Sequence, residues 1–365
     1  MNRREFLTQV LPAAVIGTAA GCSPKQTTAS DTDTPEIRWR LASSYPRSLD
    51  VIYGSSEVMS KYVAAMTGNR FKIQVYPSGE LVPALNVLDA VQNGTVAMGQ
   101  TASYYFTGKN SALAFDTGVP FGLTARQQNA WLYAGGGKQL VDEVLSDFNI
   151  LSFAGGNTGV QMGGWFRHQV NTLADLKGLK MRIPGVGGQV LSRMGVSVQL
   201  LSGSDVYPAL ERGAIDATEW VGPYDDEKLG FFRIAKNYYY PGFWEPGSNI
   251  SFYINRDEWK KLPPNYQSIL ETAMQAANLW MTANSDAKNP PAMKRMTDKG
   301  VKLLRFSDDI LKAAKKANDD YMNEESLKNP SYKKLYDSWK KFADEQKSWF
   351  KTAELSYLDF ISKDS

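Results

Sequence analysis

The chain has 365 residues, which is more than one hydrophobic core usually holds, so two lobes are expected. Its formal net charge at pH 7 is only +3, and the lysines and arginines are scattered among acidic residues instead of forming a basic stripe. Because a nucleic-acid-binding surface needs such a stripe, no nucleic acid is expected as a partner.

The N-terminus is typical of an exported protein. Arg3 and Arg4 precede a short apolar stretch, residues 10–20, which is followed by the small residues of Gly21-Cys22-Ser23. The paired arginines indicate the twin-arginine export route, so residues 1–22 are predicted to be a signal peptide. The apolar stretch is too short for a permanent membrane span.

Cys22 is the only cysteine, which excludes a disulfide framework or a thiolate metal cluster within one chain. It lies where a bacterial lipoprotein is cut and acylated, but Ala19 stands where such sites usually carry leucine. A lipid anchor is favoured, because residues 23–36 form a polar segment that would suit a tether. The alternative is plain cleavage that discards Cys22.

Residues 37–153 are predicted to form lobe I and residues 154–254 to form lobe II. Alternation of polar and apolar residues predicts strands, and apolar residues at helical spacing predict helices. The elements expected in lobe I are a strand at 36–42, a helix at 51–66, a strand at 71–76, a helix near 126–145 and a strand at 150–154 that crosses to lobe II. Those expected in lobe II are a loop at 155–159, strands at 180–183 and 196–200, a helix after Gly187, and strands at 238–240 and 251–254 that return across the lobes.

Residues 255–365 have a different character. Leu270, Met274 and Ala277 form an apolar stripe that predicts one long helix over 258–288, which is expected to join the two lobes as a hinge. After residue 308 the chain is charged and helix-prone, with one apolar face. These C-terminal helices are expected to pack on the lobes or on a second copy of the chain.

A short sequence motif occurs twice, at 87–100 and again at 206–219. In both copies a helical pattern runs into a glycine, the residue that most readily ends a helix, and a short strand follows. The repeat indicates two similar α/β halves, whose strand ends at 98–101 and 217–221 would meet at a ligand cleft. Helix, glycine and strand also follow one another in unrelated α/β proteins. The repeat alone therefore does not decide whether the chain has two similar halves around a ligand cleft.

The usual catalytic motifs are missing. The single histidine, His168, lies in a polar turn, and no serine or cysteine nucleophile has a base beside it in a recognisable motif. Gly135 to Lys138 lacks parts of a phosphate-binding loop, and the third glycine of a dinucleotide fingerprint is displaced after Gly185. An enzyme would have to rely on carboxylates alone, so an exported hydrolase of that kind is the alternative to a binding protein.

Several polar residues lie at predicted strand ends. Arg182 could hold a carboxylate with two parallel hydrogen bonds, or it could form an internal salt bridge. Glu219, Glu245 and Gln161 offer the oxygen ligands that Na⁺ or Ca²⁺ prefers. Acids and aromatics such as Trp220 also meet by chance in hydrogen-bonded cores, so these residues alone leave the choice open.

The segments 176–185, 207–217 and 81–98 resemble the DctP-type periplasmic binding proteins of tripartite ATP-independent (TRAP) transporters. The resemblance runs from about residue 38 through the C-terminal helices. It implies an α/β, two-lobed, type II-like periplasmic-binding-protein fold with a long inter-lobe helix and extra C-terminal helices, and a protein that is not an enzyme. Segments 219–230 and 238–245 look like the subgroup that binds 2-oxo acids such as pyruvate, or lactate, with a metal ion.

The resemblance also implies roles for single residues. Arg182 matches the family's carboxylate-binding arginine, and Gln161, Glu219, Trp220 and Glu245 match positions around a Na⁺ or Ca²⁺ ion that the ligand would also contact. Trp220 stands where sialic-acid and dicarboxylate relatives have asparagine, which argues against a large polyhydroxy acid.

Further substrate-binding candidates are Gln161 and Trp220 again, with Tyr104, Tyr105 and Asn157. The family implies a periplasmic location, two membrane subunits as partners and, in some members, a homodimer formed by exchange of a C-terminal helix. A different import or sensing system is an alternative setting. The residues do not distinguish pyruvate from longer oxo acids, or Na⁺ from Ca²⁺.

Overall fold

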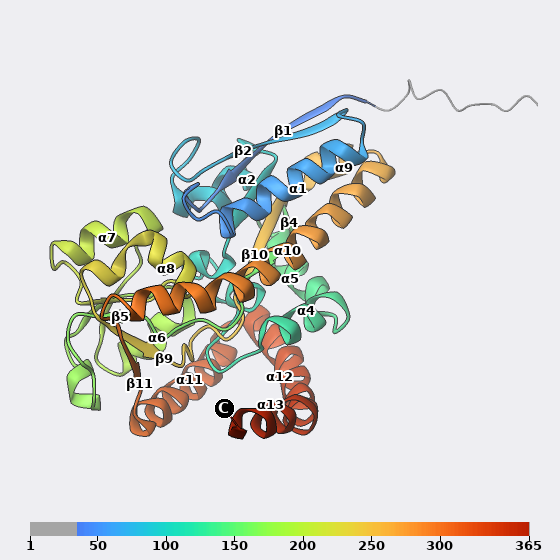
Figure 1. The fold of residues 1–365 in the computed structure, drawn as a ribbon. Helices are drawn as coiled ribbons and strands as arrows, with labels where there is room; N and C mark the ends of the chain where they lie inside the picture. The colour runs from blue at the N-terminus through green and yellow to red at the C-terminus, as the bar shows by residue number, and fades with distance from the viewer. Residues whose placement is uncertain (1–34, 365) are drawn as a thin grey trace, which may run out of the picture. The chain divides into compact units, whose positions relative to one another are not determined.

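The structure is a computed structural model that describes residues 35–364 (Figure 1). The predicted signal peptide, most of the tether and the acylation site at Cys22 lie outside the described residues. Two β-sheets organise the described chain, and each contains the strand of one copy of the repeat found in the sequence.

Sheet A has five strands in the order β2-β1-β3-β10-β4. Its strands are β1 (Ile37–Ser43), β2 (Phe71–Tyr76), β3 (Met98–Thr101), β4 (Ile150–Asn157) and β10 (Asn249–Asn255). β1 pairs in parallel with β2 and β3, whereas β10 is antiparallel to both of its neighbours. Trp39 and Leu41 of β1 are buried with Phe71 and Ile73 of β2 in one hydrophobic cluster, as their alternation predicts.

Sheet B has six strands in the order β11-β9-β5-β8-β6-β7. Its strands are β5 (Trp165–Phe166), β6 (Lys180–Arg182), β7 (Ser197–Gln199), β8 (Ala217–Thr218), β9 (Asn237–Tyr240) and β11 (Lys302–Arg305). The helices that connect them are α6 (Gly185–Arg193), α7 (Gly203–Glu211) and α8 (Pro223–Leu229).

The repeated sequence motif forms a helix followed by a strand, and one such helix-strand unit contributes to each sheet. Helix α2 (Val87–Gln92) leads through Gly94 to β3, and α7 leads through Gly213 to β8; the φ angles of the two glycines are 70° and 72°. β3 and β8 each have one parallel and one antiparallel neighbour. The predicted α/β halves are therefore present, and β9 and β10 lie in different sheets, so the chain returns from sheet B to sheet A between them.

The long helix differs from its predicted limits. Asn255 caps a short helix α9 (Arg256–Lys261), and the chain then breaks at Leu262-Pro263 before α10 (Pro264–Thr297) begins. A proline fits the first turn of a helix, which explains where α10 starts. α10 packs against α1 (Ile52–Met66) and β4 of the sheet A half and against α8 of the sheet B half (Figure 1).

Two further predictions were wrong because of glycines. The helix expected over 126–145 is divided into α4 (Ala125–Tyr133) and α5 (Gly137–Ser146), and a Cβ on Gly137 would lie 2.5 Å from the Trp131 ring. The expected loop at 155–159 instead continues β4 as far as Asn157. A Cβ on Gly155 would lie 2.3 Å from the ring of Phe252, so the glycine allows close packing within the sheet.

The remaining helices are α3 (Ala114–Thr117), α11 (Asp308–Lys328), α12 (Pro330–Phe350) and α13 (Ser356–Ile361). α11 contacts α6 and α12 contacts α4 and α5, so the C-terminal helices pack on both halves. Within residues 35–364, no helix combines the length and the apolar character needed to cross a membrane.

Candidate functional site

Loops from both sheets surround a small enclosed cavity. The loop between β4 and β5, the ends of β6 and β8 and the turn after β3 all contribute to it. Its free volume is about 10 Å³, which is about the space for one water molecule, so a ligand fits only after the side chains part. The lining residues are Tyr45, Ile52, Tyr104, Tyr105, Thr158, Gln161, Arg182, Trp220, Val221 and Ile250.

Arg182 ends strand β6 and its side chain is only 1% exposed. Its guanidinium lines the cavity, lies 4.7 Å from the ring centroid of Trp220 and donates a hydrogen bond to a carboxylate oxygen of Glu219. Nε also donates to the backbone oxygen of Leu201 at 3.2 Å. The internal salt bridge and the position at the cavity, which the sequence left as alternatives, therefore occur together.

Glu219 follows β8 and is fully buried. Burial raises its pKa well above the usual value, and the charge of Glu245 raises it further, against the opposing effect of Arg182. Glu219 Oε2 and Gln161 Oε1 have no hydrogen-bond partner among the described residues, although both atoms are buried. Two buried acceptors without donors fit a cation, which needs acceptors and no donors.

Glu245 brings the second carboxylate to the same place. Its Oε2 accepts hydrogen bonds from Tyr104 Oη at 3.1 Å and from Ser248 Oγ at 2.6 Å, and its backbone oxygen accepts from Gln161 N at 3.1 Å. Burial raises the pKa of Glu245 to about 7. Because Tyr104 follows β3 of sheet A and Glu245 follows β9 of sheet B, this contact joins the two halves.

Arg182 lines the cavity, and the buried carboxylates of Glu219 and Glu245 contact its lining residues Arg182 and Tyr104. Within residues 35–364 there is no cluster of three His, Cys, Asp or Glu side chains arranged for a metal. Glu219, Glu245 and the amide oxygen of Gln161 offer the kind of oxygen atoms that Na⁺ or Ca²⁺ prefers, and a cation site formed by them stays a prediction. A cation there would offset the negative charge that the carboxylate of a bound ligand adds to those of Glu219 and Glu245.

Of three other predicted residues, Trp220 and Tyr105 line the cavity and Asn157 does not. Trp220 lies in the cavity wall, and its Nε1 is buried without a partner among the described residues. Tyr105 lies edge-on to Tyr104, with ring centroids 5.0 Å apart, and also lines the cavity. Asn157 does not line it; its amide donates to Gly247 O at 3.2 Å and accepts from Gly159 N at 2.9 Å. A ligand contact by Asn157 stays a prediction.

The sequence interpretation missed part of the cavity wall. Tyr45 follows the carboxyl end of β1, where polar loop residues commonly meet ligands, and this position was the available signal. Its hydroxyl is buried, and burial raises its pKa well above the usual value. Ile52, Val221 and Ile250 give the cavity an apolar side that no local pattern marks as special.

Comparison with known proteins identifies the family. The model of the DctP family, bacterial extracellular solute-binding protein family 7, matches residues 42–329. The chain belongs to the DctP family. This agrees with the resemblance seen in the sequence and with the two-sheet fold.

Three relatives illustrate the DctP match. A monocarboxylate 2-oxoacid-binding periplasmic protein of Nostoc is 49% identical over 362 residues, 99% of each chain. A TRAP solute-binding protein of Bordetella bronchiseptica, solved with copurified calcium and picolinate, has a TM-score of 0.90 at 46% identity and covers 91% of this chain and 98% of its own. A TRAP solute-binding protein of Pseudoalteromonas atlantica, solved with sodium and pyruvate, has a TM-score of 0.87 at 40% identity and covers 89% and 99%.

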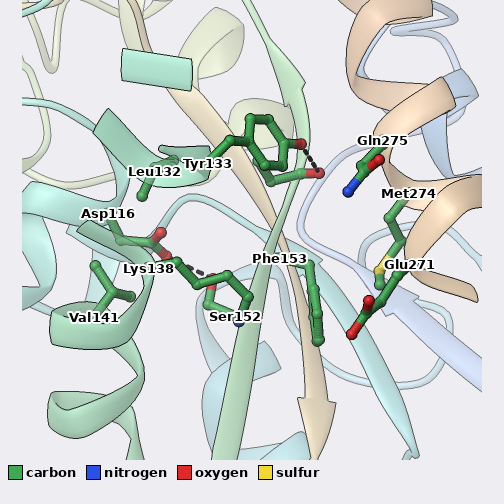
Figure 2. A pocket seen from close by; sticks show the side chains of 11 residues that line it. Asp116, Leu132, Tyr133, Lys138, Val141, Ser152, Phe153, Glu271, Met274 and Gln275 are labelled. Atoms are coloured by element: carbon green, nitrogen blue, oxygen red, sulfur yellow. Dashed lines mark hydrogen bonds between the residues drawn. The ribbon is translucent and has the colours of Figure 1, made fainter. Parts of the chain in front are cut away.

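A larger cavity of about 160 Å³ lies apart from these residues, between α4, α5, β4 and α10 (Figure 2). Two of its charged side chains, those of Asp116 and Lys138, have partners within the chain. Asp116 accepts hydrogen bonds from Ser152 Oγ at 2.9 Å and Ser251 Oγ at 2.8 Å, and Lys138 pairs with Asp142 at 2.6 Å. This cavity contains none of the predicted site residues and is not the candidate site.

Two buried acids in α8, next to the site, predict how stability depends on pH. Burial raises the pKa of Asp225 to about 7 and that of Asp226 to about 6. Asp226 accepts from Trp165 Nε1 at 2.9 Å and Tyr238 Oη at 2.7 Å, whereas Asp225 Oδ1 has no partner among the described residues. Each folded-state pKa lies above the unfolded value, so the free energy of unfolding is expected to fall as pH rises from about 4 to about 7.

Asp225→Asn should remove part of this dependence. At pH 8 the variant is expected to be more stable than the wild type by on the order of 1–3 kcal/mol, because no buried charge forms, and at pH 4 the two should be equal. Chemical denaturation of the ligand-free protein across this range measures the difference. Asp309→Asn, an exposed acid of α11, is the control. Parallel pH curves for Asp225→Asn and wild type would contradict the prediction.

Proposed function

We propose that the protein is the extracytoplasmic solute-binding component of a TRAP transporter, and that it captures a small 2-oxo acid such as pyruvate, or lactate, together with Na⁺ or Ca²⁺. The observation that carries this proposal is the buried guanidinium of Arg182 beside the unpaired acceptors of Glu219 and Gln161. The ligands named for the relatives from Bordetella and Pseudoalteromonas support the same chemistry.

In the proposed complex Arg182 turns from Glu219 toward the ligand carboxylate and holds it with two charge-assisted hydrogen bonds. Glu219, Glu245, Gln161 and the backbone carbonyl of Trp220 hold the cation. The cation supplies positive charge to the carboxylate and to the keto or hydroxy oxygen of the ligand. Tyr104 and Tyr105 close the cavity from the sheet A side, and the small volume favours a small acid.

Capture, and not chemical conversion, is the proposed role. The single histidine, His168, is not among the lining residues, and the cavity holds no serine or cysteine. The two halves close on the ligand because the closed state binds it better, and the closed protein is then the form presented to the membrane subunits.

A calorimetric titration tests the proposal. Pyruvate, lactate and a longer 2-oxo acid are added to the protein with sodium and calcium present, and succinate and sialic acid serve as comparison ligands. We expect tight binding of at least one small 2-oxo or 2-hydroxy monocarboxylate and none of sialic acid. If none of the monocarboxylates binds, or if sialic acid or succinate binds more tightly than all of them, the proposal is wrong.

Export by the twin-arginine route and a lipid anchor at Cys22 are parts of the same proposal. They fit the family description as extracellular solute-binding proteins and the periplasmic relative. Mass spectrometry of the mature protein distinguishes an acylated N-terminal cysteine from plain cleavage, which would leave an unmodified N-terminus.

A homodimer through the C-terminal helices is also proposed. Trp349 at the end of α12 is 60% exposed, and Leu355 and Phe360 after it are 58% and 70% exposed. The double variant Leu355→Asp and Phe360→Asp is expected to be a monomer in light scattering, whereas the wild type forms a dimer, because apolar area is lost from the contact. Leu279→Asp, a 72% exposed position on α10 outside the C-terminal helices, should leave the dimer intact. A monomeric wild type would contradict this prediction.

A further inference from the structure

An ionic cluster lies at the loop that precedes α1. The Asp50 carboxylate is 2.6 Å from Lys228 Nζ and 3.5 Å from Lys288 Nζ, and it accepts a hydrogen bond from Tyr224 Oη at 3.0 Å. Both ammonium groups also lie 4.9 Å from the ring centroid of Tyr224. One carboxylate therefore collects three donors from elsewhere in the chain.

The three donors lie on helices α8 and α10, far from Asp50 in the sequence. Asp50 immediately precedes the turn into α1, which covers sheet A, whereas Tyr224 and Lys228 lie on α8, directly after β8 of sheet B. Lys288 lies in the part of α10 that runs beside α8 (Figure 1). Separation of the halves would break the contacts of Asp50 with Tyr224 and Lys228.

The cluster lies outside the candidate ligand-binding cavity. None of its four residues lines the cavity that contains Arg182. Without Asp50 the ammonium groups of Lys228 and Lys288 would share one tyrosine ring with no carboxylate between them, and like charges repel. The cluster thus favours the arrangement in which Asp50 is in place, with the halves together.

The charge state of Asp50 supports this. Partial burial alone would raise the pKa of Asp50, but hydrogen bonds from Lys228 and Tyr224 and the charges of both lysines bring it below the usual value. The carboxylate is therefore ionised at neutral pH. Since its side chain remains 46% exposed, dissolved salt can screen the contacts.

We propose that Asp50 is a positioning residue that keeps the two halves closed over a bound organic acid, and that it thereby sets the dissociation rate of the ligand. This inference rests on the proposed function, because it needs a ligand that the closed halves retain. It predicts an effect on koff and not on kon, since the contacts form only after closure.

The experiment measures kon and koff for pyruvate by stopped-flow tryptophan fluorescence, on wild type and on Asp50→Asn. Asn keeps the size of the side chain and removes its charge. We expect koff to rise about two- to fivefold with kon unchanged, the range that corresponds to partly exposed ion pairs. Raising ionic strength with choline chloride, at fixed sodium and calcium, should increase koff of wild type but not that of Asp50→Asn.

Glu227→Gln is the matched control. Glu227 is also on α8 and pairs with Arg295 of α10 at 2.6 Å, but it does not contact the Asp50 loop. Its koff should equal that of wild type. Lys228→Gln should raise koff by no more than Asp50→Asn does, because Lys288 and Tyr224 still contact Asp50. The double variant should be no faster than Asp50→Asn, because Lys228 then has no carboxylate of Asp50 left to pair with.

The outcomes separate the two proposals. If wild type binds pyruvate and Asp50→Asn has the same koff and the same salt dependence, the positioning role is wrong while the proposed function stands. A change in kon alone, or an equal effect of Glu227→Gln, also overturns it. If wild type binds no monocarboxylate at all, the proposed function fails first, and the ligand found in its place is used for the same comparison.

Discussion

Arg182→Lys is expected to weaken the binding of a 2-oxo acid by at least about 100-fold, because lysine keeps the charge but cannot form two parallel hydrogen bonds with a carboxylate. Each charge-assisted hydrogen bond contributes about 1.5–3 kcal/mol, and about 1.4 kcal/mol corresponds to a factor of ten in affinity. Isothermal titration calorimetry of wild type and variant, with the cation present, measures the loss directly.

The choice of lysine follows from the burial of Arg182. Arg182→Ala would leave the Glu219 carboxylate buried without its partner, which costs about 3–5 kcal/mol when the charge is retained, so weaker binding could then reflect a damaged fold. Arg193→Lys is the control, since Arg193 forms an exposed ion pair with Glu324 and should have no effect. Undiminished affinity in Arg182→Lys, together with an unchanged unfolding temperature, would remove Arg182 from the ligand site.

Removal of the cation is expected to have a comparably large effect. In a chelator-treated, sodium-free solution, affinity for pyruvate should fall by on the order of 100-fold or more, because the ligand carboxylate would then lie near Glu219 and Glu245 with only Arg182 to offset three negative groups. Titrations after adding back Na⁺ or Ca²⁺ separately measure which ion restores binding.

Glu219→Gln tests the same site from the protein side. The variant removes one carboxylate from the proposed cation site, so it should bind the acid more weakly and respond less to added cation than wild type. Glu271→Gln, an exposed residue of α10 away from the site, is the control. Affinity that is equal with and without sodium and calcium would rule out a cation in the complex.

Patterns of neighbouring residues predicted those strands and helices that residue alternation and spacing determine. The alternation in 36–42 and 71–76 predicted β1 and β2, and the repeated helix-glycine-strand motif predicted one similar unit in each sheet. Arg182 was placed at the end of a strand for the same reason, because a short strand before Pro184 is readable from the sequence. The family resemblance added the subgroup, and it added the residues that are proposed to lie near a cation.

Packing between distant segments could not be predicted in this way. The glycines at 155 and 156 suggested a loop, yet they lie in β4 because Phe252 and Met281 occupy the space that side chains would need. The wall formed by Ile52, Val221 and Ile250 comes from three separate segments, and no pattern within any one of them indicates a cavity. The Asp50 cluster was missed for the same reason.

The apolar wall affects how the ligand specificity of the protein can change during evolution. Ile52, Val221 and Ile250 are aliphatic, so exchanging one for a smaller or larger aliphatic residue alters room for the tail of an acid without disrupting side-chain hydrogen bonds. One methylene in such a pocket changes selectivity by about 1–3 kcal/mol. Substitutions in this wall can therefore shift the specificity toward longer or branched acids in small steps, while the charged residues proposed to bind the carboxylate stay unchanged.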